Sequence, residues 1–293
     1  MEGTIQDAPD TGLAPAAHAG RVARRRWVSD AQLARIRALD HFGHSGYNRL
    51  DLDSLLDDYM RDFVEPLLRL AGAPRSVADV GAGYGWLALA FALRTDARVT
   101  AVEYDAARLA AARKIAAILD VEDRIEWLQG SIASLPLADR SMDAVYCVEV
   151  IEHTGIQPAY VAELCRVSRD VLVITTPNKL FPVINHDTAL PFCHWLPLWA
   201  RDLYASAFRR RDRQDNNLFW TPGRLLDSVG GFERVSRFMQ FGSYADYLEL
   251  RARRGGGLAQ RCLGAYLALA ARLGLRSLYV LPNLASTFRR SGS

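Results

Sequence analysis

The chain has 293 residues, of which 50% are hydrophobic, and its 36 Lys and Arg against 33 Asp and Glu give a formal net charge of +3. This length and apolar content suffice to bury a full core in one domain, with room for a subdomain. The charge excess is too small to indicate nucleic acid binding by itself. No apolar run reaches the roughly 18 residues needed to span a bilayer.

The N-terminal end is expected to form a disordered tail over residues 1–26, because its first 20 residues are rich in Ala, Pro and Gly. This stretch also lacks the apolar centre of a secretion signal. The four cysteines are scattered and form no CxxC pair, which is typical of reduced thiols. We therefore expect a cytoplasmic protein.

An N-terminal helical cap is predicted over residues 27–72. Ser29 and Gln32 make a capping-box pattern that opens a helix running to about His41. A second helix is predicted over Leu52–Leu70, where acids come early and arginines late, as the helix dipole prefers. The remaining residues, 73–293, are expected to form one larger domain.

That domain begins with a glycine-rich turn in the sequence Val-Ala-Asp-Val-Gly-Ala-Gly-Tyr-Gly-Trp-Leu, residues 77–87. An apolar run leads into glycines at positions 81, 83 and 85, and an Ala/Leu-rich segment follows. This order predicts a strand, a tight turn and a helix. Glycines allow positive φ angles and close approach of a ligand to the backbone, and the first N–H groups of the helix point into the same space.

An acidic residue, Glu103, ends the next predicted strand, about twenty residues beyond the glycines. In a βαβ unit an acid at this distance binds ribose hydroxyls. A dinucleotide fingerprint that begins at Gly81 needs Gly or Ala at position 86, where this chain has Trp86. The chain contains no GxxxxGK[ST] motif. An adenosine-containing ligand without a pyrophosphate therefore fits better.

Strands and helices are predicted to alternate through the core, which indicates a doubly wound parallel α/β sheet. The expected elements are strands at 77–80, 99–103, 125–129, 144–148 and 171–175 and helices at 87–93, 106–119 and 160–167. Ligands of such sheets bind beyond the carboxyl ends of the strands. This rule places Gly81, Glu103, Gly130, Glu149 and Pro177 along one rim.

Three sequence features together carry a resemblance to a known family: Asp79-Val-Gly-Ala-Gly-Tyr-Gly85, the acid Glu103, and residues 130–153, which end in Cys-Val-Glu-Val-Ile-Glu-His. Over residues 75–178 the chain resembles the class I S-adenosylmethionine-dependent methyltransferases, most closely the small-molecule branch with the ubiquinone and menaquinone enzymes. The resemblance implies an enzyme with a Rossmann-like seven-stranded methyltransferase sheet and S-adenosyl-L-methionine as cofactor.

By position in these motifs, the resemblance also implies the residues of the cofactor site. They are Asp79, Gly81, Ala82, Gly83, Gly85, Glu103, Tyr104, Ser131, Ile132 and Glu149. In the family the glycine turn touches the amino-acid end of the cofactor, the acid binds the ribose, and the loop after the third strand holds the adenine. The family usually has Asp where this chain has Ser131. A hydroxyl there, beside the apolar Ile132, is expected to preserve binding.

After the fifth strand, residues 179–221 form an insertion that is dense in aromatics, prolines and histidines. It is expected to form the acceptor pocket, with a lid that merely covers the core as the alternative. Two later segments, 231–239 and 278–288, are predicted to be the antiparallel strands that close the sheet. Between them Leu258–Leu275 is apolar and helical, and it either packs on its own domain or docks on a membrane or lipid-linked substrate.

The expected chemistry is in-line methyl transfer, most favourably to oxygen, with a proton to be removed from the acceptor. His153 and His186 are the candidate general bases, and a structural role is the alternative for each. No spacing demands a metal, so none is expected. An Asn/Asp-Pro-Pro-aromatic motif is missing after strand four. The acceptor is therefore expected to be a small or lipid- or glycan-linked molecule and not nucleic acid.

Two other functions remain open, a non-catalytic binding protein with the cofactor fold and an NAD-dependent oxidoreductase. Peripheral membrane contact is compatible with the sequence, and the oligomeric state is not indicated.

Overall fold

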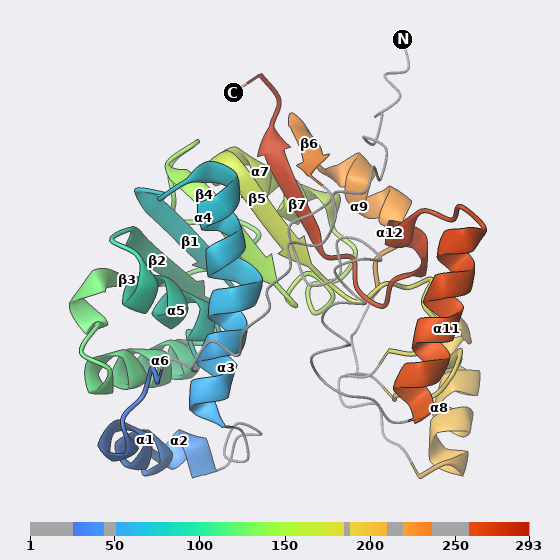
Figure 1. Cartoon of the computed structure of the whole chain (residues 1–293), viewed down its shortest axis with the longest axis horizontal. Coiled ribbons are helices and arrows are strands. Elements are labelled where there is room, and N and C mark those ends of the chain that lie inside the picture. The colour runs from blue at the N-terminus through green and yellow to red at the C-terminus, as the bar shows by residue number, and fades with distance from the viewer. Residues whose placement is uncertain (1–25, 44–50, 185–187, 210–218, 236–257, 293) are drawn as a thin grey trace. The chain divides into compact units, whose positions relative to one another are not determined.

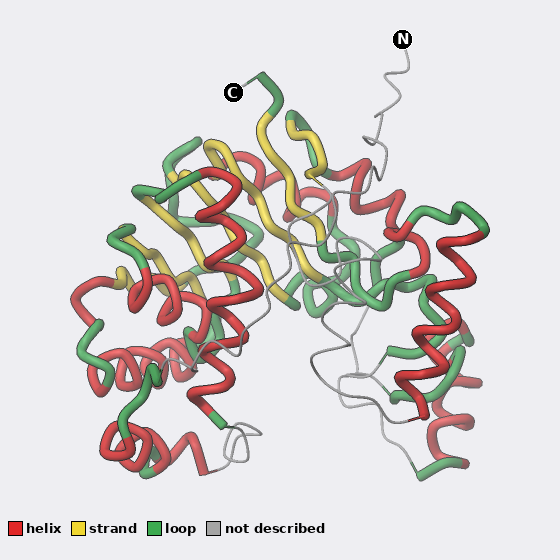
Figure 2. The backbone as a smooth tube through the Cα atoms, viewed as in Figure 1, coloured by secondary structure: helices red, strands yellow, loops and turns green. Residues whose placement is uncertain are grey.

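The computed structural model describes residues 26–43, 51–184, 188–209, 219–235 and 258–292. The described strands form one sheet in the order β3-β2-β1-β4-β5-β7-β6 (Figures 1 and 2). These strands are β1 Ser76–Val80, β2 Arg98–Glu103, β3 Ile125–Gln129, β4 Met142–Val148, β5 Ser168–Thr175, β6 Phe232–Val235 and β7 Ser286–Arg290. The α/β class and the seven-stranded Rossmann-like sheet expected from the sequence are thereby confirmed.

The strands run in the directions that the sequence predicts, parallel in the core and antiparallel at the closing edge. β1 pairs in parallel with β2, and β2 with β3. At the other end of the sheet, β7 pairs antiparallel with both β5 and β6, with Val171 opposite Arg289 and Phe232 opposite Arg290. The predicted antiparallel pair that closes the sheet is therefore present.

The chain divides into two compact units, and the division runs through β4. The first unit comprises residues 1–131 and 141–144, and the second comprises residues 132–140 and 145–293. In the first unit, α5 Trp86–Arg94 and α6 Ala106–Ile118 alternate with β1, β2 and β3. Every residue of β1 is buried, as expected for a parallel strand covered on both faces.

The N-terminal helices of the first unit begin where the sequence predicts. Ser29 caps α1, Asp30–Arg37, and Gln32 completes the capping box. The predicted continuation to His41 is interrupted at Ala38, and a separate short helix, α2, covers Asp40–Gly43. The Gln32 side chain also donates to the carbonyl of Ile118 at 3.1 Å, which fixes α1 against the end of α6.

The second predicted N-terminal helix is present, but its middle turn is π-helical instead of α-helical. It consists of α3 Leu52–Tyr59, a π-helical turn η2 Met60–Val64, and α4 Glu65–Ala71, which run on as one rod in Figure 1. Pro66 lies in the first turn of α4 and has no N–H to bond the carbonyl four residues earlier. The wider turn before it, with Glu65 N–H bonded to Met60 O, adapts the chain to the proline.

A short 3-10 helix, η3 Glu122–Arg124, precedes β3 in the first unit, and the other described helices belong to the second unit. They are α7 Pro158–Val167, η4 Cys193–Trp195, α8 Leu198–Ala207, α9 Pro222–Ser228, α11 Leu258–Arg272 and α12 Ser277–Val280. No helix in the described part of the chain is long and apolar enough to cross a membrane.

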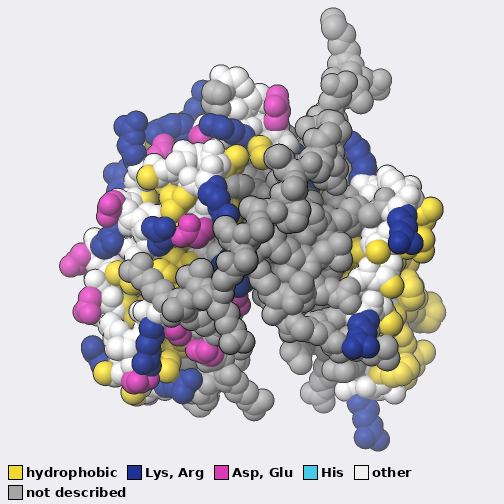
Figure 3. Space-filling view, in the orientation of Figure 1, with side chains coloured by type: hydrophobic (Ala, Val, Ile, Leu, Met, Phe, Trp, Pro, Cys, Tyr) yellow, Lys and Arg dark blue, Asp and Glu magenta, His cyan; other side chains and the backbone are white. Residues whose placement is uncertain are grey.

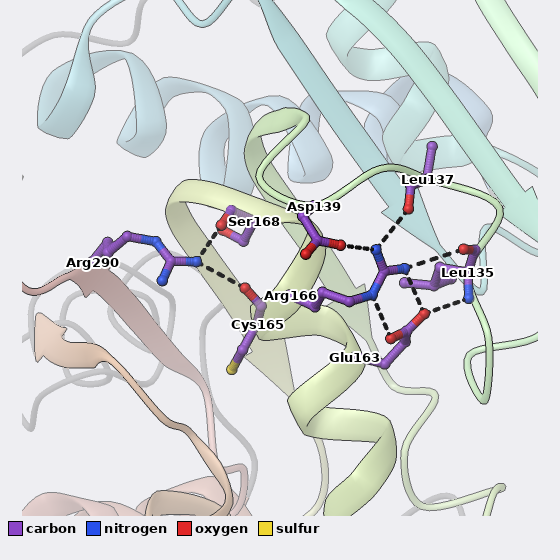
Figure 4. A network of polar contacts seen from close by, with 8 residues as sticks. All are labelled: Leu135, Leu137, Asp139, Glu163, Cys165, Arg166, Ser168 and Arg290. Carbon is purple, nitrogen blue, oxygen red and sulfur yellow. Dashed lines mark hydrogen bonds and ion pairs between the residues drawn. The ribbon is translucent and has the colours of Figure 1, made fainter.

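Two arginines join segments of the second unit (Figure 4). Arg166 of α7 bonds the carboxylates of Glu163 and Asp139 and the carbonyls of Leu135 and Leu137. Arg290 of β7 donates to carbonyls at the junction of α7 and β5, those of Cys165 and Ser168. These contacts tie the loop before β4 to α7 and tie the last strand to its neighbour.

The predicted strand at 278–288 is wrong over its first half. The chain instead forms α12 and enters β7 only at Ser286. The side-chain amide of Asn178 donates to the carbonyls of Leu278 and Leu281, at 3.1 and 2.8 Å, which occupies groups that a strand would use. Pro282 follows and cannot donate to a ladder. The other predicted strand, 231–239, is confirmed as β6 over Phe232–Val235, and its end lies outside the described residues.

Candidate functional site

The glycine turn after β1 is bonded to the end of β2. The N–H groups of Gly81 and Ala82 both donate to the carbonyl of Val102, at 2.8 and 3.1 Å, and Gly85 N–H donates to Ala82 O at 2.7 Å. Gly81, Gly83 and Gly85 all have left-handed backbone, with φ of 77°, 55° and 77°. Side chains other than glycine are strained in this conformation, which explains the alternate glycines.

Two of the glycines also differ in what surrounds them. A Cβ at Gly85 would lie 3.1 Å from the Cβ of Ala112 and 3.4 Å from the ring of Trp127. At Gly83 a Cβ would meet nothing within 4 Å. The turn therefore packs tightly against α6 and β3 at Gly85 and borders open space at Gly83.

Glu103 connects this turn to the neighbouring strand ends. Its buried carboxylate accepts the N–H of Gly83 on Oε2 at 2.7 Å and the N–H of Asp105 on Oε1 at 3.0 Å. A carboxylate offers about four acceptor positions, so two remain for a ligand. The Glu103 carbonyl accepts the N–H of Gly130 at 3.0 Å, which joins the start of the loop after β3. The ends of β1, β2 and β3 thus meet at one acid.

Asp79 supports the helix that follows the turn. Gly85 is the N-cap of α5 and has no side chain to cap it, whereas Asp79 Oδ2 accepts the N–H of Ala88 at 3.2 Å. Burial raises the pKa of Asp79 to about 7, against the opposing effect of the Ala88 hydrogen bond, and the charge of Glu103 raises it further. This acid therefore contacts helix backbone, while its predicted contact with the cofactor stays a prediction.

Two tyrosines beside the turn lie in different environments. Tyr84, within the turn, stacks on His41 of α2, with ring centroids 5.5 Å apart. Tyr104, a predicted cofactor contact, has 77% of its surface exposed, and its carbonyl accepts Gln129 Nε2 at 3.2 Å. Helix α2 thus contacts the glycine turn through Tyr84, and the Tyr104 ring is mostly exposed to solvent.

The adenine-loop candidates follow Gly130 directly. Ser131, at the end of the first unit, is partly buried, and Ile132, at the start of a segment of the second unit, is buried. Their predicted contacts with the adenine stay predictions.

In the second unit, two carboxyl groups pair at the end of β4. Glu152 is fully buried, accepts the hydroxyl of Thr176 at 2.9 Å and lies near Glu149. Burial raises the pKa of Glu152 well above its usual range, and the charge of Glu149 acts in the same direction.

The backbone at this pair is also unusual. Glu149 has a φ of 55°, in the left-handed region, and its N–H donates to the carbonyl of Thr175 at 2.9 Å. Such strain in a residue other than glycine persists only where surrounding contacts hold it, and it is concentrated at functional sites.

His153 lies next to the carboxyl pair. Its Nε2 is 3.8 Å from Glu152 Oε1, and its ring is partly exposed. A partly exposed imidazole beside a buried carboxyl group is suited to proton transfer. The second candidate base, His186, lies outside the described residues. Sequence reasoning missed Glu152 as a partner of His153, although the spacing of Glu149 and Glu152 by three residues was a usable signal.

No cluster of three or more His, Cys, Asp or Glu side chains able to hold a metal ion occurs among the residues that the structure describes. The expectation that the protein uses no metal stays a prediction.

Comparison with known proteins bears on the same region. Residues 77–170 match the family model of a methyltransferase domain. A probable S-adenosylmethionine-dependent methyltransferase of Mycolicibacterium smegmatis is 31% identical over 195 residues, which are 66% of this chain and 64% of that protein. An O-methyltransferase of Pyrenophora dematioidea is 30% identical over 107 residues, 36% of this chain and 40% of that protein.

The fold has a match among solved structures. A candidate sarcosine dimethylglycine methyltransferase from Galdieria sulphuraria aligns with a TM-score of 0.50 and 16% identity, over 82% of this chain and 87% of that one. At this identity the likeness concerns the fold alone.

The sheet order, the glycine turn with its acidic partner and these matches define a class I methyltransferase fold. Over residues 77–170 the chain is similar to a methyltransferase domain, and the relative from Mycolicibacterium smegmatis is named a probable S-adenosylmethionine-dependent enzyme. It spans less than two thirds of the length of the curated relatives named here, 64% and 40%. The narrower resemblance to the quinone methyltransferases stays a prediction.

Substitution of the acid at the strand ends tests its predicted contact with the cofactor. We expect Glu103→Ala to weaken S-adenosylmethionine binding about 10- to 100-fold, because the ribose would lose hydrogen bonds to a charged acceptor. Isothermal titration calorimetry measures the change. Glu126→Ala, an exposed acid on the adjacent strand β3, is the matched control and should bind normally. Equal affinity of Glu103→Ala and the control would refute the ribose contact.

The raised pKa of Asp79 predicts a specific pH dependence of stability. The folded protein holds the proton up to about pH 7, whereas the unfolded chain releases it near 3.8, so stability falls as pH rises through this window. Asp79→Asn keeps an acceptor for Ala88 and does not titrate. Between those pH values, the free energy of unfolding of the wild type should fall relative to the variant by up to about 4 kcal/mol. Denaturant titrations of both proteins measure this difference, and a constant difference would contradict it.

Proposed function

We propose that the protein is an enzyme that transfers the methyl group of S-adenosylmethionine, in line, to an oxygen atom of a small or lipid- or glycan-linked acceptor. The observation that carries this proposal is the bonding of Glu103 to Gly83. It positions a carboxylate with two remaining acceptor sites beside the open glycine turn. The same arrangement fits a ribose diol and the backbone-lined seat of an amino-acid group.

The cofactor, when bound, supplies a methyl group activated on a positively charged sulfur. The protein therefore has to hold its groups in place and remove a proton from the acceptor. The glycine turn and Glu103 would hold the cofactor. His153 would accept the proton, and Glu152, which lies beside its Nε2, would orient the ring.

Methylation of oxygen is favoured over carbon or nitrogen by two considerations. A base beside the acceptor is needed when a hydroxyl is the nucleophile, because its proton must be removed. One of the relatives is an O-methyltransferase, although the match covers only 36% of this chain. The insertion after β5 contributes the exposed aromatic side chain of Trp195, which suits an acceptor with an apolar part.

The alternatives receive less support from the same residues. Trp86 is buried in the first turn of α5, at the position where a dinucleotide fingerprint needs a small residue. A non-catalytic binding protein would not need the base beside β4. The expected cytoplasmic location stays a prediction.

Ligand-dependent thermal stabilisation separates these alternatives. S-adenosylmethionine at a hundredfold excess over its dissociation constant should stabilise the protein by about 2.7 kcal/mol, because it binds the folded state alone. NAD should have no effect at the same concentration. Stabilisation by NAD and not by S-adenosylmethionine would establish the oxidoreductase, and stabilisation by neither would contradict the proposed cofactor site.

The proposed base is tested by turnover with cofactor binding as a second readout. We expect His153→Gln to lower methyl transfer about 100-fold and to leave the affinity for S-adenosylmethionine unchanged, since the residue acts on the acceptor. S-adenosylhomocysteine release is measured with a panel of sugar and phenol hydroxyl acceptors. Gln157→Ala, an exposed residue just beyond His153, is the control and should turn over normally. Normal turnover of His153→Gln would remove the histidine from the mechanism.

A further inference from the structure

Exposed apolar side chains are concentrated in one part of the second unit. Among the described residues, the exposed large apolar side chains all lie between positions 180 and 279, with the single exception of Tyr104. They are Leu180, Phe192, Trp195, Leu196, Leu198, Trp199, Leu203, Phe208, Tyr266, Leu269, Leu273, Leu275 and Tyr279. Single exposed apolar residues are ordinary, but such a concentration marks an interaction surface.

Helix α8 contributes an apolar face that the described chain does not cover. Its buried side is formed by Arg201 and Ala205, four residues apart. On the other side, Trp199 and Leu203 are 74% and 70% exposed and are also four residues apart. Residues with this spacing lie one above the other on a helix, so they form one stripe that faces solvent.

Helix α11 has the same property. Leu267 and Ala270 are buried against α12. Tyr266, Leu269 and Leu273, spaced by three and four residues, are exposed, with values of 56% for Leu269 and 66% for Leu273. An apolar stripe in addition to the packed face is not needed to hold the helix on its own domain. The sequence left two alternatives open for this helix, packing on its own domain and docking on a membrane or lipid-linked substrate. The buried face of α11 supports the first, and its exposed apolar face supports the second.

The two helices attach to the same short segment, residues 178–181. Asn178 donates to the carbonyls of Leu278 and Leu281, which lie in and just after α12, the helix packed against α11. The Phe181 ring contacts the ring of Tyr266 in α11. The carbonyl of Lys179 bonds the ring nitrogens of His194 and Trp195, which precede α8. These contacts hold α8 and α11 to one short segment, and hydrophobic side chains gather on this side of the molecule, at the right of Figure 3.

Exposed charges around these stripes are almost all positive. Within residues 179–184, 188–209 and 258–281, the exposed charged side chains of the described chain are Lys179, Asp202, Arg209, Arg261, Arg272 and Arg276. Five of these six are cations. Figure 3 shows Lys and Arg side chains among the hydrophobic ones on this side. A face that combines apolar residues with arginines matches the chemistry of a lipid surface with anionic headgroups.

We propose that the surface formed by α8 and α11 docks on a lipid bilayer that carries anionic headgroups. Trp199, Leu203, Leu269 and Leu273 enter the boundary between headgroups and acyl chains, where tryptophan is especially favourable. The arginines and Lys179 face the anionic headgroups. The helices lie on the membrane and do not cross it.

Charge also decides between a bilayer and a second copy of the chain. A symmetric dimer brings the same patch of each copy together. This surface would then place arginines opposite arginines, with one aspartate per copy to offset them, which is unfavourable for burial. An anionic membrane complements the same charges.

Flotation of the full-length protein with lipid vesicles tests the proposal. We expect the protein to bind vesicles of phosphatidylglycerol and phosphatidylcholine, and to bind phosphatidylcholine alone much more weakly. Rising salt should weaken the binding because it screens the headgroup charge. Trp199→Ser/Leu203→Ser and Leu269→Ser/Leu273→Ser should each lower vesicle binding about tenfold or more, since they remove inserted apolar area. Arg272→Gln/Arg276→Gln should lower it about tenfold on the anionic vesicles.

Matched controls remove similar groups elsewhere. Arg35→Gln/Arg37→Gln removes two exposed charges from α1, and Tyr104→Ser removes an exposed large apolar side chain of the first unit. Both should bind vesicles like the wild type. Thermal stabilisation of the surface variants by S-adenosylmethionine shows that they are folded, and it keeps a failure of vesicle binding distinct from a failure of cofactor binding.

Three results would overturn the proposal. The first is absence of binding to the anionic vesicles. The second is an equal loss in the control and surface variants. The third is a dimer, seen by light scattering, that the surface substitutions convert to monomers, which would make this face an interface between copies.

Discussion

The hydrogen bond from the Gly83 N–H to the Glu103 carboxylate, 2.7 Å long, joins the two turns on which the first unit's site depends. Glu103 also accepts the Asp105 N–H and, through its carbonyl, the Gly130 N–H. The acid thus fixes the glycine turn, the start of α6 and the loop after β3 before a ligand arrives. Because only two of its acceptor positions are used, the groups that hold the turn also leave room for a diol. Preorganisation of this kind lowers the ordering cost of binding.

Two further carboxyl groups are buried, Asp79 in the first unit and Glu152 in the second. Burial is the main cause of the raised pKa of each. Asp79 caps α5 from the adjacent strand, because the N-cap glycine has no side chain. Glu152 is enclosed beside Thr176 and Glu149 at the end of β4. Burial disfavours the charged form of both groups and raises the pKa of each. The first acid supports the turn that is proposed to seat the cofactor, and the second lies beside the proposed base.

Local patterns in the sequence were sufficient to predict most of the central fold. The strand Ile125–Gln129 was predicted with its observed bounds, and the glycine turn was recognised because its residues are contiguous. Features that depend on distant contacts were not predictable. The apolar run at 278–281 becomes a helix because Asn178, a hundred residues earlier, bonds its carbonyls. The left-handed backbone of Glu149 after β4 was not predicted, nor was the exposure of Tyr104, which directly follows the buried strand β2. Pro66 was visible in the sequence, but the π-helical response to it was missed.

A crystal structure of the protein with S-adenosylhomocysteine tests the central claim most directly. We expect the two ribose hydroxyls to lie within hydrogen-bond distance of the Glu103 carboxylate, with the amino-acid end of the ligand against residues 81–85. The Gly83 and Asp105 N–H groups should remain bonded to Glu103. A ligand bound away from Glu103, or a glycine turn that has to release Glu103 to admit it, would contradict the account.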